Sequence, residues 1–125
     1  MKAFLIDTNI LVDFLRGKQR ANNFMNQLEI QPIISSLTVA ELFAGVKGKK
    51  ERVSLHNLIN ACEVIPITTE IAEEGGLIKN KYQKSHHIGL ADALIGATAI
   101  EADLTLATLN KKHFPMLKKI NVLYS

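Results

Sequence analysis

Phe4-Leu5-Ile6-Asp7-Thr8-Asn9 joins three bulky apolar residues to a carboxylate, which a hydroxyl and an amide side chain follow. A short unbroken apolar run is typical of a strand buried on both faces, as in the core of a parallel sheet. Apolar residues at helical spacing follow over 10–15, and this pattern ends at Gly17. Asp7 therefore lies where a buried strand passes into a helix, and ligands of open α/β sheets bind at that end of the strands.

Strand and helix patterns alternate along the rest of the chain. Short strand patterns recur at 31–34, 64–67, 104–107 and 120–123. Helical patterns cover 18–28, 37–46, 49–62, 69–84 and 89–102, and 110–114 reads as a polar turn or short helix. The Gly75-Gly76 pair indicates either a close helix contact or a break in its helix. The alternation predicts a single α/β domain over residues 1–125, with a central, mostly parallel sheet of four or five strands flanked by helices.

Composition narrows the function classes. The 125 residues are 47% hydrophobic, which suits one core, and no apolar run approaches the ~18 residues of a membrane span. The single cysteine, Cys62, excludes an internal disulfide and agrees with a cytoplasmic location. The formal net charge is +3 and the pI about 9.1, which is compatible with a polyanionic partner but is weak support alone. We expect neither a signal peptide nor contact with a membrane.

Three acidic residues stand out because each interrupts an apolar context. Asp7 ends a buried strand, Glu41 lies in the apolar helix pattern at 37–46, and Asp92 is the only charged residue between 90 and 100. A buried carboxylate has to be paired, protonated or bound to a metal. No Lys or Arg lies near Asp7 or Asp92 in sequence, and carboxylate oxygens are the ligands that Mg²⁺ and Mn²⁺ prefer. The sequence therefore predicts a metal-binding carboxylate cluster at the strand ends.

Each acid also has a purely structural alternative. Asp7 can cap the helix that follows it. Glu41 can form a capping box with Thr38, and Asp92, three residues after Gly89, can favour the positive end of its helix. Three such acids, each at an element junction in apolar surroundings, favour a shared site over three separate caps.

The acids belong to four sequence blocks that follow one another along the whole chain. The blocks are LIDTN at 5–9, SLTVAEL at 36–42, GLADALIGATA at 89–99 and LATLNKKHF at 106–114. Together they resemble the PIN-domain family, and more narrowly the VapC-type toxins of bacterial and archaeal toxin–antitoxin pairs. The resemblance implies a Mg²⁺-dependent endoribonuclease, with Mn²⁺ as a substitute, that a small antitoxin protein holds inactive. It also implies a homodimer and a larger toxin–antitoxin assembly.

The resemblance assigns roles residue by residue. Asp7, Glu41 and Asp92 match the family's three most dependable acidic positions, which implies that they bind the metal and act in catalysis. Thr8 and Asn9 match the motif neighbours, where a hydroxyl or amide orients a carboxylate or a water. Asp7 and Asp92 would bind the ion directly, and Glu41 would bind it directly or through a water.

The last block departs from the family pattern. A fourth acid is frequent there, whereas this sequence has Asn110 and, three residues on, His113, so the number of bound metals stays open. Asp103 does not replace that acid, because it precedes its strand and is expected at the opposite end of the sheet. We expect Asn110 to position ligands or water, and Lys111, Lys112 and His113 to contact RNA.

Bulky apolar residues on the first three helices have two interpretations. Ordinary core accounts for any one of them, while the resemblance implies a groove for the antitoxin's C-terminal segment and a dimer face. These residues are Phe14, Leu15, Phe24 and Phe43.

Other families that begin with a strand and an Asp fit less well. Phosphatases of the haloacid-dehalogenase type need a second Asp where this sequence has Asn9, and receiver domains need paired acids after the first strand. Within the PIN-domain family, a housekeeping RNA-processing nuclease and a catalytically silent RNA- or partner-binding module remain as alternatives.

Overall fold

The chain begins with the strand and helix that its sequence predicts. In the computed structural model, which describes residues 3–124, β1 (Phe4–Ile6) leads into α1 (Thr8–Leu15), and Asp7 is the N-cap between them. Leu5 and Ile6 are both fully buried and belong to separate core clusters. Because successive side chains of a strand point to opposite faces, β1 is buried on both faces, as expected.

Strands and helices alternate as predicted. The elements that follow α1 are α2 (Gln19–Gln27), β2 (Ile33–Ser35), α3 (Ser36–Ala44), α4 (Gly48–Asn60), β3 (Glu63–Ile65), α5 (Thr69–His86), α6 (Leu90–Glu101), β4 (Thr105–Thr108), the 3-10 helix η1 (Lys111–His113) and β5 (Ile120–Val122). Their ends differ from the predicted ends by no more than two residues. No helix among residues 3–124 is both long and apolar enough to cross a membrane.

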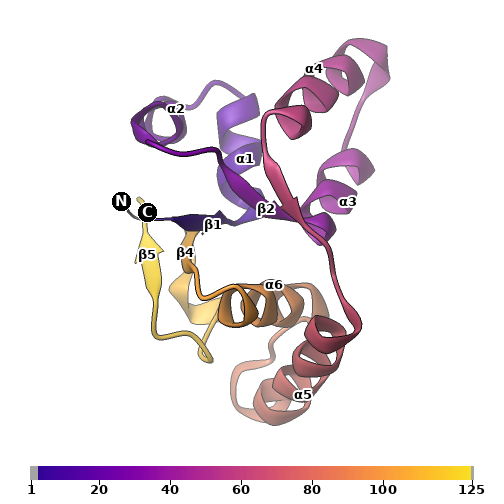
Figure 1. Ribbon diagram of the computed structural model, residues 1–125, viewed down its shortest axis with the longest axis vertical. Helices are drawn as coiled ribbons and strands as arrows, with labels where there is room; N and C mark the ends of the chain where they lie inside the picture. Colours follow the sequence, from indigo (N-terminus) through magenta and orange to yellow (C-terminus); the bar gives the residue numbers. More distant parts are fainter. Residues whose placement is uncertain (1–2, 125) are drawn as a thin grey trace.

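All five strands form one sheet in the order β3-β2-β1-β4-β5, and every pairing between neighbours is parallel. The prediction of a parallel sheet is confirmed. The chain adds strands outward from β1 on one side and then returns to add β4 and β5 on the other (Figure 1). The order therefore reverses between β1 and β4, and ligands of open α/β sheets bind at such a switch point, outside the carboxyl ends of the strands.

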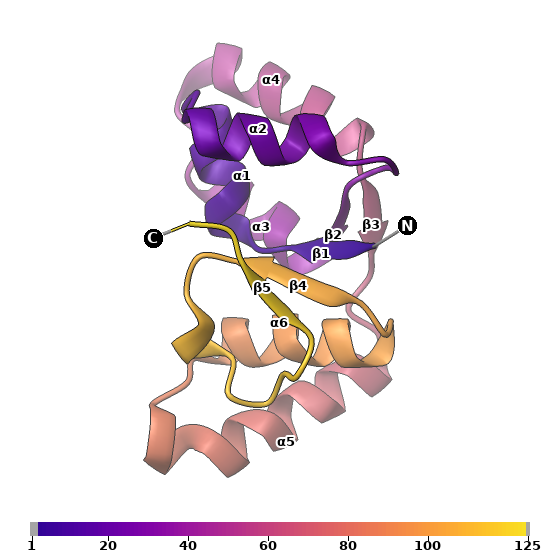
Figure 2. The same ribbon diagram turned by 90° about the vertical axis from the view of Figure 1, so that its left-hand side faces the viewer.

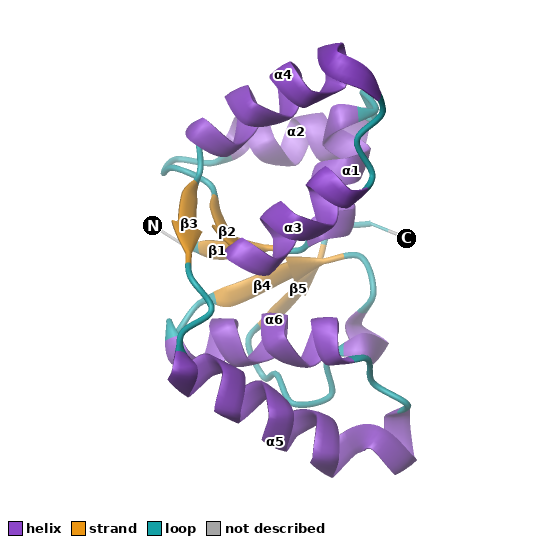
Figure 3. Cartoon of the chain, turned by 90° about the vertical axis from the view of Figure 1, so that its right-hand side faces the viewer, coloured by secondary structure: helices purple, strands orange, loops and turns teal. Residues whose placement is uncertain are grey.

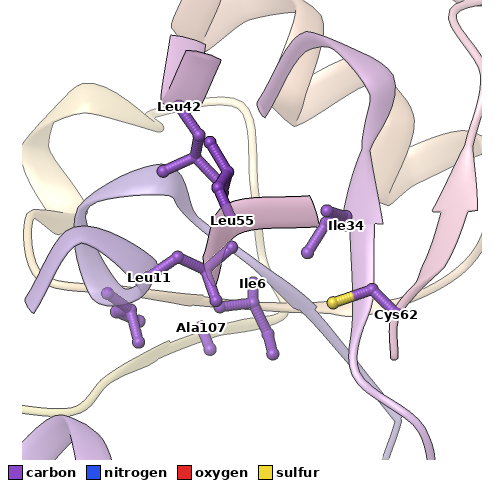
Figure 4. Close-up of a cluster of buried hydrophobic side chains, with 8 residues drawn as sticks. Ile6, Leu11, Ile34, Leu42, Leu55, Cys62 and Ala107 are labelled. Atoms are coloured by element: carbon purple, nitrogen blue, oxygen red, sulfur yellow. The ribbon is translucent and has the colours of Figure 1, made fainter. Parts of the chain in front are cut away.

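Helices cover both faces of the sheet. Figures 1 and 2 show α1 to α4 on one side of the sheet and α5 with α6 on the other. The side of α1 to α4 holds a buried cluster, shown in Figure 4, of Ile6, Ile10, Leu11, Ile34, Leu42, Leu55, Cys62 and Ala107. The side of α6 holds a second cluster of Leu5, Ile33, Ile95, Ala99, Leu106 and Phe114. Burial raises the pKa of the Cys62 thiol, which donates to the Leu58 carbonyl, so Cys62 is a core residue as predicted.

Gly75 and Gly76 do not break α5, which is continuous from Thr69 to His86 and runs beside α6 (Figure 3). Gly75 is buried, and a Cβ built on it would lie 2.5 Å from Leu94 Cδ2, whereas nothing lies within 4 Å of a Cβ on Gly76. Of the two predicted alternatives, the close helix contact is therefore correct. This contact fixes α6 against α5, and the first turn of α6 carries Asp92.

Candidate active site

Asp7 lies at the switch point, beside the carboxyl end of β4. Its side chain is buried, with 7% of the residue exposed. Oδ1 accepts the backbone N–H of Thr8 at 2.8 Å, and Oδ2 accepts the hydroxyl of Thr108, the last residue of β4, at 2.7 Å. Asp7 thus caps α1, as its structural alternative predicts, yet each carboxylate oxygen keeps a lone pair for a further partner.

The surroundings of Asp7 oppose its ionisation. Burial raises its pKa above the ordinary value, and the hydrogen bonds from Thr108 and Thr8 lower it. The negative charge of Glu41 raises the pKa of Asp7 further, and His113 lowers it. Residues from α3 and η1 therefore act on Asp7 through space.

Glu41 reaches this sheet edge from α3. Its Oε1 accepts the hydroxyl of Thr8 at 2.7 Å, and that hydroxyl also lies 3.0 Å from the hydroxyl of the buried Thr38. Because Thr8 has a single hydroxyl proton, Thr38 is the donor in the second pair. The alternative of a capping box between Thr38 and Glu41 is wrong, because α3 begins at Ser36 with Ser35 as its N-cap.

Asp92 lies in the first turn of α6 and faces η1. Its Oδ2 is 3.3 Å from Nδ1 of His113, and Nε2 of His113 is 3.1 Å from Nδ2 of Asn110. Burial raises the pKa of Asp92, His113 lowers it, and the charges of Asp7 and Glu41 raise it again. The pKa of Asp92 is therefore raised by both of the other acids, and that of Asp7 by Glu41.

The three predicted acids face one region at the carboxyl ends of the strands. Among residues 3–124, no three His, Cys, Asp or Glu side chains form a ready set of direct metal ligands. Mg²⁺ does not require such a set, since it usually keeps several waters and binds through one or two carboxylates. Burial and neighbouring acids raise the pKa of both Asp7 and Asp92, so a nearby divalent cation would stabilise their ionised forms. The donor set present here therefore fits Mg²⁺.

Residues 4–120 match the PIN domain. The chain belongs to the PIN domain family. Ribonuclease VapC10 of Mycobacterium tuberculosis is 39% identical over 119 residues, which cover 93% of this chain and 89% of that protein. Ribonuclease VapC19 of the same organism is 39% identical over 126 residues, which cover 96% of this chain and 98% of the relative. The predicted resemblance to PIN-domain proteins of the VapC type is confirmed.

Solved structures agree with this PIN-domain assignment. A chain of a toxin-antitoxin complex from Klebsiella pneumoniae superposes with a TM-score of 0.85 at 28% identity, over 99% of both chains. A chain of VapBC2 from Rickettsia felis, bound to a DNA fragment from its promoter, gives 0.79 at 26% identity over 98% of both chains. The predicted α/β fold, with helices on both faces of a parallel sheet, is confirmed.

The other residues considered from the sequence of this PIN domain differ in exposure and in position relative to the acids. Lys111 and Lys112 are exposed on η1, next to His113. Asn9 is exposed on the first turn of α1, and its side chain makes no hydrogen bond within residues 3–124. Asp103 precedes β4 and pairs with Lys119, so it lies at the opposite end of the parallel sheet, as predicted.

Two buried hydroxyls complete the PIN-domain site beyond the residues predicted from sequence. Thr108 donates to Asp7, and the hydroxyl of Thr38 is hydrogen-bonded to that of Thr8, which donates to Glu41. Both are fully buried. The available signal was a hydroxyl side chain inside an apolar block: Thr108 ends a strand beside the switch point, and Thr38 precedes Glu41 by about one helical turn.

Proposed function

We propose that this PIN domain is a Mg²⁺-dependent endoribonuclease, the toxin of a toxin–antitoxin pair, that hydrolyses RNA phosphodiester bonds with a metal-activated water. The convergence of Asp7, Glu41 and Asp92 at the switch point carries the proposal. Relatives at 39% identity are named ribonucleases, and PIN-domain ribonucleases generally depend on a divalent metal. Mn²⁺ would substitute for Mg²⁺, because both ions accept carboxylate and water oxygens.

The site's residues divide into cation-binding and orienting groups. Asp7 and Asp92 would hold the cation, and Glu41 would reach it directly or through a water. A bound divalent ion would lower the pKa of a coordinated water and offset charge on the phosphate oxygens. The hydroxyls of Thr8 and Thr108 fix the carboxylates of Glu41 and Asp7.

RNA would approach across η1. Lys111 and Lys112 are exposed there, and His113 on the same short helix contacts Asp92. Lysine ammonium groups beside the cation site would offset phosphate charge and hold the strand over the reacting bond. RNA affinity should then fall steeply as salt concentration rises.

A cavity of about 470 Å³ suits the antitoxin. It lies between α1, α3 and α4, and its lining residues are Val12, Leu15, Arg16, Glu41, Leu42, Gly45, Val46, Lys47, Lys50, Glu51, Ser54 and Leu55. We infer that it receives a segment of the antitoxin, because the relatives of known structure are chains of toxin–antitoxin complexes. A homodimer, a larger toxin–antitoxin assembly and a cytoplasmic location are part of the same proposal.

Of the four apolar residues considered for this face, Leu15 is 43% exposed and lines the cavity. The rings of Phe24 and Phe43 pack internally, against Phe4 and His56. Phe14 is half-buried, so the ordinary-core interpretation holds for most of the set.

Cleavage of RNA by paired variants tests the function. Asp92→Asn keeps the side-chain size but removes a cation-binding charge, whereas Asp103→Asn makes the same change at the far end of the sheet. Asp92→Asn should reduce the Mg²⁺-dependent cleavage rate by more than about 100-fold, the upper end of what outer-shell substitutions cost. Asp103→Asn and the wild type should cleave alike, and EDTA should stop both.

Full activity of Asp92→Asn would remove the proposed role of this carboxylate. RNA binding without any metal-dependent cleavage by the wild type would favour the silent binding module instead. A nuclease whose gene has no neighbour encoding a small DNA-binding protein would favour the housekeeping alternative.

A further inference from the structure

The side chain of Asn110 is fixed at both ends of its amide. Its Oδ1 accepts the backbone N–H of Lys112 at 3.2 Å, which makes Asn110 the N-cap of η1. Its Nδ2 lies 3.1 Å from Nε2 of His113. An amide oxygen only accepts hydrogen bonds and an amide nitrogen only donates them. Because Oδ1 caps η1, the amide atom that faces His113 is the donor Nδ2.

This donor determines where the proton of neutral His113 lies. Nε2 must accept from Asn110, so it carries no proton, and the ring proton is on Nδ1. Nδ1 is the atom that lies 3.3 Å from Oδ2 of Asp92. In this tautomer the imidazole presents an N–H to the carboxylate.

Asn110 also takes part in the hydrogen bonds that reach Asp7. Its backbone N–H donates to Oγ1 of Thr108 at 3.2 Å, and the hydroxyl proton of Thr108 then goes to Oδ2 of Asp7 at 2.7 Å. Asn110 is therefore hydrogen-bonded to the side chain that faces each of the two aspartates, Thr108 at Asp7 and His113 at Asp92. Asn110 and His113 lie in the block where the family resemblance implies a fourth acid, so neutral donors stand where a further negative charge is frequent.

We propose that Asn110 and His113 are positioning residues of the cation site: Asn110 holds His113 in its Nδ1–H tautomer, and His113 orients the Asp92 carboxylate. The inference rests on the proposed metal-dependent function and deepens it. Hydrogen bonds that orient metal ligands are worth about 10–100-fold in metal affinity. His113 therefore serves the acidic site, in place of the RNA contact that its sequence position predicts.

The tautomer is measurable without any metal. Long-range ¹H–¹⁵N correlation spectra of the full chain in EDTA at neutral pH separate protonated from unprotonated ring nitrogens. We expect an unprotonated Nε2 for His113 in the wild type and a mixture of tautomers in Asn110→Ala. A protonated Nε2 in the wild type, or an unchanged spectrum in Asn110→Ala, would overturn the proposal.

Cation affinity provides the second readout, measured by calorimetry with Mn²⁺ alone. His113→Leu removes the donor and should weaken binding by about 10–100-fold. His113→Asn can place an amide N–H where Nδ1–H lies, and it should recover most of the affinity. His113→Leu should bind RNA in EDTA as the wild type does.

The outcomes separate this inference from the function on which it rests. If the wild type binds no Mn²⁺, or Asp92→Asn binds it equally well, the proposed function fails. If the wild type binds Mn²⁺, Asp92→Asn does not, and His113→Leu matches the wild type, only the positioning role fails. A loss of RNA affinity in His113→Leu with unchanged Mn²⁺ affinity would return His113 to an RNA contact.

Discussion

Gly75→Ala and Gly76→Ala place the same methyl group on adjacent positions of α5, one facing α6 and the other facing open space. The Cβ at Gly75 would lie 2.5 Å from Leu94 Cδ2 and 3.3 Å from Leu94 Cα. Rotation of the Leu94 side chain can relieve the first contact but not the second, which is to the backbone. Both variants gain about 1 kcal/mol of helix propensity, and only Gly75→Ala incurs an overpacking cost of about 1–3 kcal/mol.

Both variants gain the same helix propensity, so the difference between their free energies of unfolding equals the overpacking cost. Gly76→Ala should therefore be the more stable by about 1–3 kcal/mol. At this chain length that difference corresponds to roughly 4–12 °C in Tm. Urea unfolding followed by circular dichroism measures it directly. Because Leu94 is two residues from Asp92 on α6, Gly75→Ala should also weaken Mn²⁺ binding while Gly76→Ala should not. Coincident unfolding midpoints would refute the reasoning, since α5 and α6 would then have room for a methyl group.

Two further predictions concern the acids. In EDTA, Asp92→Asn should melt at a higher temperature than the wild type at pH 7.5, because the folded state raises the pKa of Asp92 above 3.8 and so disfavours its charge. The wild type loses this stability as the pH rises from about 3.8 through the folded-state pKa, so the gap in Tm should shrink towards pH 4; a constant gap would contradict the assignment. Thr108→Val removes the hydroxyl that donates to Oδ2 of Asp7 and accepts from the Asn110 N–H, which should lower the free energy of unfolding by about 1–3 kcal/mol and weaken Mn²⁺ binding. Thr108→Ser should restore both the stability and the Mn²⁺ affinity. Urea unfolding curves and Mn²⁺ calorimetry of Thr108→Val and Thr108→Ser test this prediction.

Local pattern was enough to predict the elements of this fold. Consecutive apolar residues such as Leu5 and Ile6 indicate burial on both faces of a strand, which helices on both sides of a parallel sheet provide. The order of the strands could not be predicted, because no residue pattern in β2 or β4 indicates on which side of β1 each strand pairs. Whether Gly75 marks a helix contact or a helix break could not be predicted either, because the contacting side chain is that of Leu94 on another helix.

The acids of the site and Thr8, the partner of Glu41, could be found from sequence, whereas the partners of Asp7 and Asp92 could not. A carboxylate such as Asp92 inside an apolar helix is conspicuous, because burying a charge is costly. Threonine is common in buried strands, so Thr108 carries no comparable signal. Its hydrogen bond to Asp7 joins residues 101 positions apart, and only the pairing of β1 with β4 brings them together. Asn110 and His113 are three residues apart, so both could be named as candidates from one sequence block. That His113 contacts Asp92 on α6 did not follow from the sequence.

The kind of partner that each acid has argues for a cation site over a structural one. A domain that needed these carboxylates only for stability would pair them with lysine or arginine, yet within residues 3–124 no such side chain lies at ion-pair distance from Asp7, Glu41 or Asp92. Threonine hydroxyls contact two of them, and the imidazole of His113 faces the third. Hydroxyl donors orient the oxygen atoms of Asp7 and Glu41 without neutralising them, so this negative charge is left for a bound cation. Burial and the neighbouring acids raise the pKa of both aspartates, so their ionised forms destabilise the site when no cation is bound.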